Sequence, residues 1–372
     1  MEQNPELRAL RGRRGLARAE IIAAGVLPNP VLAGHFSFPL AGAEATVYGA
    51  GADLSWDATS LLGLGARIES AEADYDAVDL EVAWQEWQVA VGARLHALRA
   101  VSLGHRIEVA EQIARTWQER TDALERAQGS GATTALEVRD ATLLAAEARM
   151  ALQALRRERA VELAALATAI GADPADVPAL RSASEVRADL PALERLLDGL
   201  PERRLDLIAL RHRYRGRGAA LDAAHAGAFP PIQIGVFVNQ EVDENLSAGP
   251  TLSIQIPVFD RNQAQIARAE AAREQTADEY EARLRQARND VVALEHQRQS
   301  ILRELEAATL AAAAAADLAE RGRRAHAGGA LTLLQVHEIE RRAWAATLRQ
   351  LELEQLAGDL RVGLAVASGR PF

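Results

Sequence analysis

The hydrophobic pattern of residues 249–271 changes halfway along the segment. Apolar and polar side chains first alternate, a period of two that predicts a half-buried β-strand. The apolar members of that strand are Leu252, Ile254, Ile256 and Val258. After Asp260 the apolar spacing becomes three to four residues, which predicts a helix that continues to about residue 326. Residues 51–73 show the same change, so a strand followed at once by a long helix occurs twice.

The chain repeats itself at a spacing of 198 residues. The segment SGATTALEV at 130–138 matches GGALTLLQV at 328–336, and RIESAEA at 67–73 matches QIARAEA at 265–271. Both matches have the same offset, since 329 − 131 = 198 and 265 − 67 = 198. The repeats predict an internally duplicated architecture.

Each copy predicts the order helix, strand, strand, long helix, tight turn, helix. The elements of the first copy are expected near 4–26, 29–39, 45–58, 62–128 and 133–170, and those of the second near 203–227, 230–240, 249–259, 262–326 and 331–368. We therefore predict repeat 1 at 1–171 and repeat 2 at 201–372, interleaved as one structural unit. Prolines make the linking segment 172–200 look irregular.

The two longest predicted helices are too long for a globular core. At ~1.5 Å per residue each would reach ~100 Å. The first carries a coiled-coil seam with steps of three and four residues. Its members include Leu103, Ile107, Ala110, Ala114, Trp117, Thr121 and Leu124. An ordinary antiparallel coiled coil would explain the helices, but it leaves the four strands unexplained.

The four predicted strands share one design. Each is about ten residues long and apolar on one face, as a tilted transmembrane β-strand is. The candidate lipid-facing residues are Tyr48, Leu54, Trp56, Ile232, Ile234, Val236, Leu252, Ile254 and Ile256. Four strands are too few to close a barrel with a lumen, whereas three copies would supply twelve. The alternative is a soluble sheet packed on its own helices.

Composition removes several classes of site. The chain has no cysteine, which excludes disulfides and thiolate metal sites. Its net charge is −10 and it contains no long basic run, which argues against a nucleic-acid partner. We predict neither a cofactor nor a metal site. No run of eighteen apolar residues occurs, and the start does not have the features of a signal peptide. Either the protein is cytoplasmic or, as we expect, its leader is absent from this chain.

Nearly the whole chain resembles the TolC family of outer-membrane efflux proteins. The resemblance rests on NPELRALRGRRGLARAEIIAAGVLPNP at 4–30, on GPTLSIQIPVFDRNQAQIARAEA at 249–271, and on the turns AQGSGATTALEVRDA and AHAGGALTLLQVHEI. The stretch IPVFDRNQAQI is most similar to the CzcC-like branch, the outer-membrane partners of heavy-metal exporters of the resistance-nodulation-division (RND) class.

This resemblance implies a fold and a set of partners. The fold is mainly α-helical with membrane β-strands, and a homotrimer closes a twelve-strand outer-membrane barrel and a periplasmic tunnel of twelve helical strips. A periplasmic adaptor binds the helix tips, and an inner-membrane RND pump drives export of heavy-metal cations. A duct for drugs or for secreted proteins is the alternative within the family. Family members often carry a lipidated N-terminal cysteine, which this chain lacks.

The resemblance also assigns site residues at the two turns. The expected adaptor-docking residues are Gly129, Ser130, Gly131, Thr133, Thr134, Gly328, Gly329 and Thr332. In the family, acidic residues ring the closed end six and nine positions after the turn glycine. Those positions here are Glu137, Asp140, Gln335 and Glu338, with Gln335 departing from the carboxylate pattern. The plainer alternative is that Glu137 and Asp140 only complement the helix dipole.

Other classes of protein find little support in the sequence. GAGADL at 49–54 lacks the third glycine of a dinucleotide loop, and HEIER at 337–341 lacks the second histidine of a zinc-protease motif. We therefore predict that the protein is not an enzyme. A soluble coiled-coil scaffold remains as the rival from a different class.

Overall fold

The chain folds into long helices and four antiparallel strands, as predicted. The computed structural model describes residues 4–37, 49–180, 190–240 and 245–370. It divides into two compact units, each built from both sequence repeats. One unit, here called the hairpin unit, comprises Met1–Ala9, Trp84–Arg204 and Arg285–Phe372. The other, the sheet unit, comprises Leu10–Ala83 and Leu205–Leu284.

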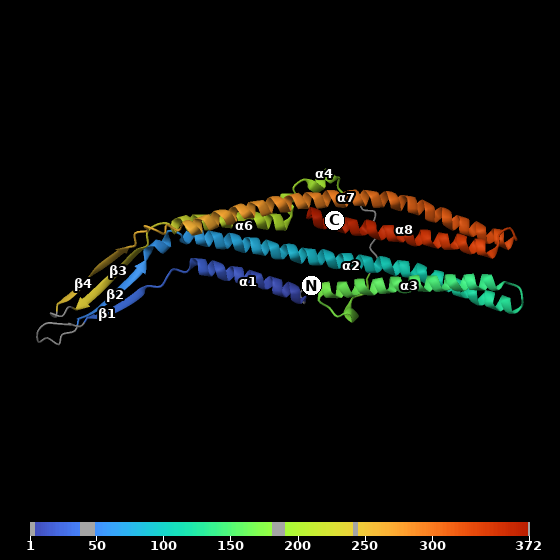
Figure 1. Cartoon of the computed structure of the whole chain (residues 1–372), viewed down its shortest axis with the longest axis horizontal. Helices are drawn as coiled ribbons and strands as arrows, with labels where there is room; N and C mark the ends of the chain where they lie inside the picture. Colours follow the sequence, from blue (N-terminus) through green and yellow to red (C-terminus); the bar gives the residue numbers. More distant parts are fainter. Residues whose placement is uncertain (1–3, 38–48, 181–189, 241–244, 371–372) are drawn as a thin grey trace. The chain divides into compact units, whose positions relative to one another are not determined.

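Three helices have residues in both units, and the remaining elements belong to one or the other (Figure 1). The shared helices are α1 (Pro5–Gly25), α2 (Leu64–Gly129) and α7 (Gln263–Ala327). The sheet unit adds β1 (Val31–Ser37), β2 (Gly49–Asp57), η1 (Ala58–Leu61), α6 (Leu205–Ala226), β3 (Ile232–Gln240) and β4 (Leu246–Ile254). The hairpin unit adds α3 (Ala135–Ile170), η2 (Pro174–Asp176), α4 (Leu193–Leu197), α5 (Leu200–Arg203) and α8 (Leu333–Ser368). The repeat boundaries at 171 and 201 stay a prediction.

The sheet has the strand order β1-β2-β3-β4, with every neighbouring pair antiparallel. The register places predicted apolar positions opposite one another: Leu54 lies opposite Val236, and Ile234 lies opposite both Trp56 and Leu252. Because paired residues in a ladder point to the same face, one face of the sheet is apolar across all four strands. That face also carries Leu32 and Phe36 from β1, and both side chains are about three-quarters exposed.

The last strand differs from its prediction. We expected a strand at 249–259, but β4 ends at Ile254, so the assignment of Ile256 to a strand is wrong. The reason is the partner: β3 begins at Ile232, opposite Ile254, and the residue before it, Pro231, accepts a hydrogen bond from Gln255 N at 3.0 Å but has no N–H to donate in return. Ile256 is nevertheless exposed. Tyr48, another candidate, lies outside the described residues.

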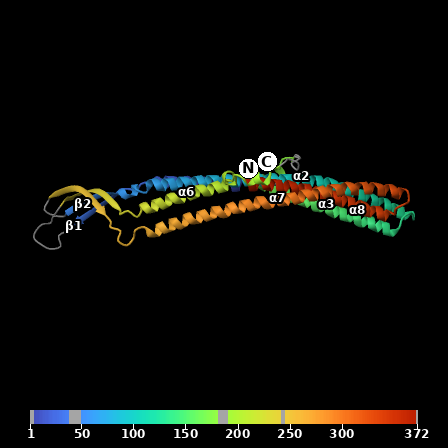
Figure 2. The ribbon, with the colours of Figure 1, turned by 90° about the horizontal axis from the view of Figure 1, so that it is seen from above.

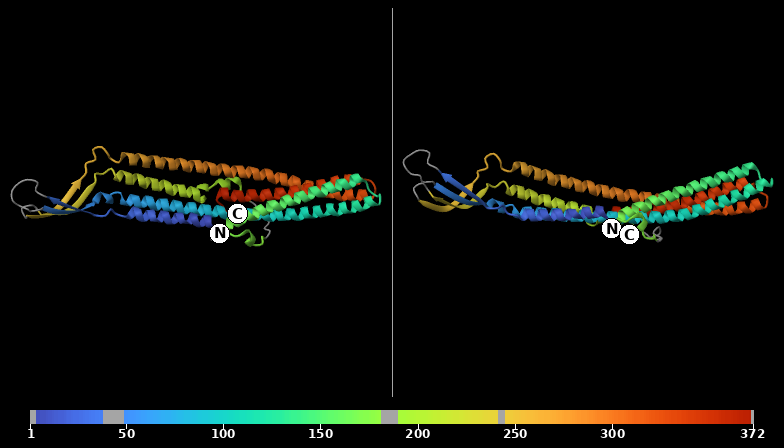
Figure 3. Two further views of the ribbon diagram at one scale, coloured as in Figure 1. Left: turned by 60° about the horizontal axis from the view of Figure 1, so that its bottom comes forward. Right: turned by 90° about the horizontal axis from the view of Figure 1, so that it is seen from below.

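The hairpin unit is held by coiled-coil packing, as the seam predicted. Its α2–α3 core contains Leu103, Ile107, Ala110, Ala114, Leu152 and Leu155. Figures 2 and 3 show α2, α3, α7 and α8 running side by side toward two turns. Both hairpins therefore present their turns at the same end of the unit.

The linking segment is more regular than predicted. We expected irregular chain over 172–200, but α4 and the start of α5 lie there. They form because Leu196 and Leu200 are fully buried against Val291 of α7 and Leu364 of α8. Tertiary burial thus outweighs the local proline content.

Candidate functional site

The two turns at the ends of the hairpins have the same backbone construction. Gly131 and Gly329 adopt left-handed conformations, with φ of 74° and 77°. The amide after each glycine bonds back into the preceding helix, Ala132 N to Ala127 O and Ala330 N to Ala325 O, both at 2.9 Å. This six-to-one bond is the helix-ending pattern that favours glycine. The sequence match between the turns therefore reflects a shared backbone requirement.

Each returning helix begins with a reciprocal capping box. Thr134 caps α3 with Glu137 as its partner, and Thr332 caps α8 with Gln335. The Glu137 carboxylate accepts hydrogen bonds from Thr133 Oγ1 at 2.6 Å and from Thr134 N at 2.9 Å. These bonds, that of Thr133 first, lower the pKa of Glu137. A capping box also accepts glutamine, which explains how Gln335 replaces a carboxylate without loss of the turn.

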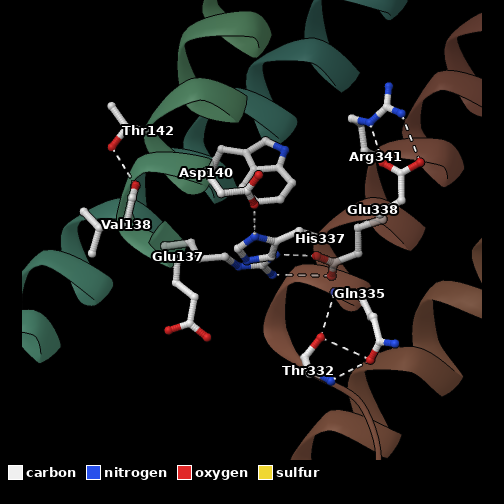
Figure 4. Close-up of polar contacts among 12 residues, drawn as sticks. Glu137, Val138, Asp140, Thr142, Thr332, Gln335, His337, Glu338 and Arg341 are labelled. Atoms are coloured by element: carbon white, nitrogen blue, oxygen red, sulfur yellow. Dashed lines mark hydrogen bonds and ion pairs between the residues drawn. The ribbon is translucent and has the colours of Figure 1, made fainter. Parts of the chain in front are cut away.

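The other two residues expected to ring the closed end, Asp140 and Glu338, make different contacts. Asp140 of α3 lies 2.9 Å from Nδ1 of His337 on α8, so it joins the two hairpins (Figure 4). Glu338 faces the surface of its own helix, where it accepts hydrogen bonds from Arg341 and Arg342. The bond from Arg341, followed by that from Arg342, lowers the pKa of Glu338 to about 2, so it is ionised at neutral pH. The four candidates therefore do not form one cluster within the chain.

Next to Asp140 lies a buried polar cluster that the sequence did not reveal. His337 is 1 % exposed, and its ring packs edge-on against Trp117 of α2 with centroids 4.8 Å apart. Glu340, one turn further along α8, is 2 % exposed and pairs with Arg120 of α2 and Arg323 of α7. This cluster joins α2, α3, α7 and α8 just inside the turns. Its signal was the HEIER segment, whose histidine and second glutamate are three residues apart and share a helix face.

The ionisation of this cluster follows from burial and its arginines. Burial lowers the pKa of His337, although the bond to Asp140 opposes the shift. The imidazole is therefore neutral at neutral pH, and because a carboxylate only accepts, Nδ1 carries the proton. Its Nε2 is buried without a hydrogen-bond partner among the described residues. Burial works against ionisation of Glu340, but hydrogen bonds and charge from Arg120 and Arg323 hold its pKa below the usual value.

Two other kinds of site are not found among the described residues. Across the described parts of the chain, no helix has both the length and the apolar character needed to span a bilayer. In the same parts, no three His, Asp or Glu side chains are grouped so that they could hold a metal ion.

The sequence matches known proteins over nearly its whole length. Residues 1–172 and 196–370 match the family model described as outer membrane efflux protein. The chain is 31 % identical to outer membrane protein OprJ of Pseudomonas aeruginosa over 45 % of its own length and 37 % of OprJ. It is 26 % identical to the pyoverdine export outer membrane protein OpmQ of Pseudomonas putida over 97 % of its length and 82 % of OpmQ. It is also 25 % identical to the cation efflux system protein CusC of Escherichia coli, over 71 % of its length and 59 % of CusC.

The three-dimensional comparison agrees with the sequence comparison. A crystal structure of CusC superposes with a TM-score of 0.80 at 22 % identity, covering 99 % of this chain and 90 % of that one. This likeness confirms the predicted fold, with its long helices and four antiparallel strands. The chain spans less than two thirds of the length of OprJ and of CusC in the sequence matches. From the family model and the fold together, the chain belongs to the outer membrane efflux protein family of TolC-like channel proteins, which are not enzymes.

Proposed function

We propose that three copies of this chain form the outer-membrane exit duct of a tripartite efflux system. An inner-membrane RND pump delivers the cargo through a periplasmic adaptor into a tunnel walled by the helices. The strands carry the wall across the outer membrane. Family membership over nearly the whole chain supports this proposal.

The observation that carries the proposal is the exposed apolar face of the sheet. Leu54, Ile234 and Leu252 point to this face, and their side chains are 46 %, 47 % and 66 % exposed. A continuous apolar surface of this kind favours aggregation in water, whereas a membrane-spanning strand presents such a face to lipid. We therefore assign the apolar members of β1–β4 to the lipid side of a barrel.

The strand order supports assembly from several copies. β1 and β4 are the outer strands of the described sheet, so each has a neighbour on one side. In lipid an open edge leaves backbone groups unsatisfied, and four strands cannot close around a lumen. Pairing β4 of one copy with β1 of the next would close twelve strands with three copies.

The turns are the proposed adaptor-docking sites. Gly131 and Gly329 leave the backbone accessible, since a Cβ at either position would meet nothing within 4 Å. The exposed residues of the turns are fixed by capping rather than by packing, which leaves their outer surface available to another protein. Ser130 and Thr332 lie on that outer surface and are exposed.

The proposed aperture comprises Glu137, Asp140, Gln335 and Glu338. Three carboxylates per chain would become nine around a threefold axis, and such a ring attracts cations. Glu137 and Glu338 are ionised according to their lowered pKa values. Asp140 would contribute less to the lumen, because His337 engages it.

Heavy-metal cations are the proposed cargo, and an organic molecule is the second candidate. The likeness of IPVFDRNQAQI to the CzcC-like branch and the match to CusC, a cation efflux protein, favour metal. The match to OpmQ, a pyoverdine exporter, covers more of the chain and favours an organic cargo. With no cysteine and two methionines, the wall offers few soft ligands, so selection would be left to the pump.

Complementation tests the proposal directly. The chain, with a bacterial leader added, is expressed in a Gram-negative strain that lacks its own channel but keeps a metal pump and adaptor, or a drug pump and adaptor. Restored resistance in the metal strain alone supports metal export, and restored resistance in the drug strain alone supports the second candidate. Failure in both strains, with the protein present in the outer membrane, contradicts the duct function.

Detergent dependence separates a duct from a soluble scaffold. We expect the protein to fractionate with the outer membrane and to stay trimeric only in detergent. A monodisperse protein in buffer without detergent would favour the scaffold instead.

A further inference from the structure

The glycines of the sheet lie almost entirely on one face. Within the described strands, Gly34 belongs to the apolar face, and the opposite, polar face carries Gly49, Gly51, Gly235 and Gly249, here called the polar-face glycines. Glycine weakens a strand, because it loses more backbone entropy on folding and has no side chain to pack. None of the polar-face glycines has a left-handed backbone, whereas the glycines with positive φ lie at helix ends. Backbone conformation therefore does not explain them.

Each polar-face glycine lies opposite a residue that has a side chain. The register gives four such pairs: Gly49 with Ser37, Gly51 with His35, Gly235 with Thr251 and Gly249 with Phe237. In each pair the partner's side chain lies where a Cβ on the glycine would be placed. A Cβ on Gly51 would be 2.3 Å from His35 Cε1, and a Cβ on Gly249 would be 3.1 Å from Phe237 Cε1. These side chains therefore lie across the glycines, along the sheet.

A hydrogen bond that passes over one strand shows the same orientation. Thr251 Oγ1 of β4 donates to Asp53 Oδ2 of β2 at 3.3 Å, although β3 lies between these two strands. Strands two apart in a sheet are separated by roughly 9–10 Å, so both side chains extend over β3 to meet. Gly235 of β3, directly opposite Thr251, places no side chain in their way. The β2 backbone is also close to this glycine, since a Cβ there would lie 2.4 Å from Leu54 O.

The apolar face shows no such arrangement at its glycine. A Cβ on Gly34 would have the backbone oxygen of Gly51 as its nearest neighbour, at 3.8 Å, so no side chain lies across Gly34. The two faces also differ in exposure. Val236 on the apolar face is 56 % exposed, whereas Asp53 and Phe237 on the polar face are half-buried. The side chains of the polar face thus cover one another to a greater extent than those of the apolar face.

We propose that the polar-face glycines set the bore of the duct, because they let the side chains opposite them lie along the wall instead of projecting into the lumen. The proposal rests on the duct proposed above, in which the apolar face meets lipid and the polar face lines the lumen. His35 and Phe237 are the largest side chains held in this way. The glycines are therefore positioning residues for the passage of cargo.

Symmetry multiplies the effect of each pair. The inward side chains of a closed barrel converge on its axis, and the strand number fixes the space that is left for them. With three copies, a side chain that rises from the wall enters the lumen three times at the same height. Side chains that lie flat leave the strand-lined passage open to a cargo larger than a bare cation. This part of the duct then does not select its cargo by size.

Labelling of one cysteine by reagents of graded size tests the bore, because the parent chain has no cysteine. Ser253→Cys places a thiol on the polar face, opposite Gln233 and one pair closer to the helices than the four glycine pairs. Cells carrying the full chain, with a bacterial leader added, are treated from outside with polyethylene glycol maleimides of increasing length. The longest reagent that labels Ser253→Cys defines the size limit of the passage.

Three variants in the Ser253→Cys chain change the wall. Gly249→Phe puts a second ring beside Phe237, and we expect labelling by the longest reagents to be lost. Adding Phe237→Gly to that variant exchanges ring and glycine between the two strands, which should restore the size limit. The matched control is Ala248→Phe, which adds the same ring at the next position on the apolar face and should leave the limit unchanged. Gly51→Phe, beside His35, repeats the test at a second pair.

The outcomes separate the bore from the duct. An unchanged size limit in Gly249→Phe and Gly51→Phe, with trimers intact in native mass spectrometry, would overturn the bore proposal and leave the duct standing. A limit that stays lowered in the exchange variant would also overturn it, because room on a glycine would then not be what matters. If even the shortest reagent fails to label Ser253→Cys in cells but labels the unfolded chain, the polar face lines no open lumen, and the duct and the bore fail together.

Discussion

Replacing Glu340 by alanine removes the carboxylate on which two arginines converge. Glu340 is 2 % exposed and accepts from Arg323 Nη1 at 3.0 Å and from both terminal nitrogens of Arg120. The variant leaves Arg120, 22 % exposed and stacked over Trp117, without its counter-charge. Arg323 is 52 % exposed and can turn to water.

The stability cost of Glu340→Ala depends mainly on Arg120, the more buried of the two arginines. Breaking a buried ion pair from one side costs ~3–5 kcal/mol. Arg323 adds little because exposed pairs are worth less than ~1 kcal/mol, and Arg120 keeps its contact with Trp117. We therefore expect Glu340→Ala to cost ~3 kcal/mol of local stability. Replacing both charges, Arg120→Met with Glu340→Leu, should stay within ~1 kcal/mol of the parent.

Hydrogen exchange of the trimer in detergent measures this cost where it arises. A loss of ~3 kcal/mol speeds exchange on the order of a hundredfold, in peptides that cover Trp117 and Glu340. Arg349→Ala is the control, because its pair with Glu304 is half exposed on both sides and should change exchange little. Unchanged exchange in Glu340→Ala, or an equal loss in the double variant, would refute the reasoning.

Three further predictions concern the turns. The folded-state pKa of His337 is lowered, so its contribution to stability is complete above the unfolded pKa, ~6.5, and is lost as the pH falls through the lower folded value. Hydrogen exchange around His337 should therefore become faster from pH 7.5 to 5.5. A His337→Phe variant should remove that increase. Thr134→Ala removes the cap of α3 and should cost ~1 kcal/mol at that turn, seen as faster exchange in the first turn of α3 only. Neutralising Glu137, Asp140 and Glu338 to their amides should reduce cation selectivity and multivalent block in planar-bilayer recordings, and wild-type values for both would contradict the proposed aperture.

The turns illustrate how far local chemistry determines structure. Gly131 and Thr134 are fixed by a left-handed helix end followed by an N-cap, and these requirements involve residues within six positions of one another. The pattern in the sequence was therefore sufficient to place both turns. The same applies to the α2–α3 seam, because a heptad pattern specifies which face of a helix is buried.

Contacts between different segments of the chain decided where β4 ends and that α4 forms, which the local sequence pattern did not predict. The alternation that continues past Ile254 predicts a longer strand, yet β4 ends there, because the next residue of the partner segment, Pro231, has no N–H to donate to it. Likewise, α4 forms in a proline-rich segment because its leucines reach α7 and α8. In both cases the deciding contact comes from another segment of the chain, and for α4 the partners lie about a hundred residues or more away in the sequence.

By itself the sequence determined the order of elements, the duplicated plan, the turn geometry and the apolar face of each strand, because each depends on residue spacing of a few positions. Only the tertiary structure decided that His337 and Glu340 are buried and that Asp140 and Glu137 have different partners. The physical reason is that burial and ionisation depend on the charges that other helices bring close. Arg120 and Arg323 lie 220 and 17 positions from Glu340, and no local sequence pattern predicts that both contact its carboxylate.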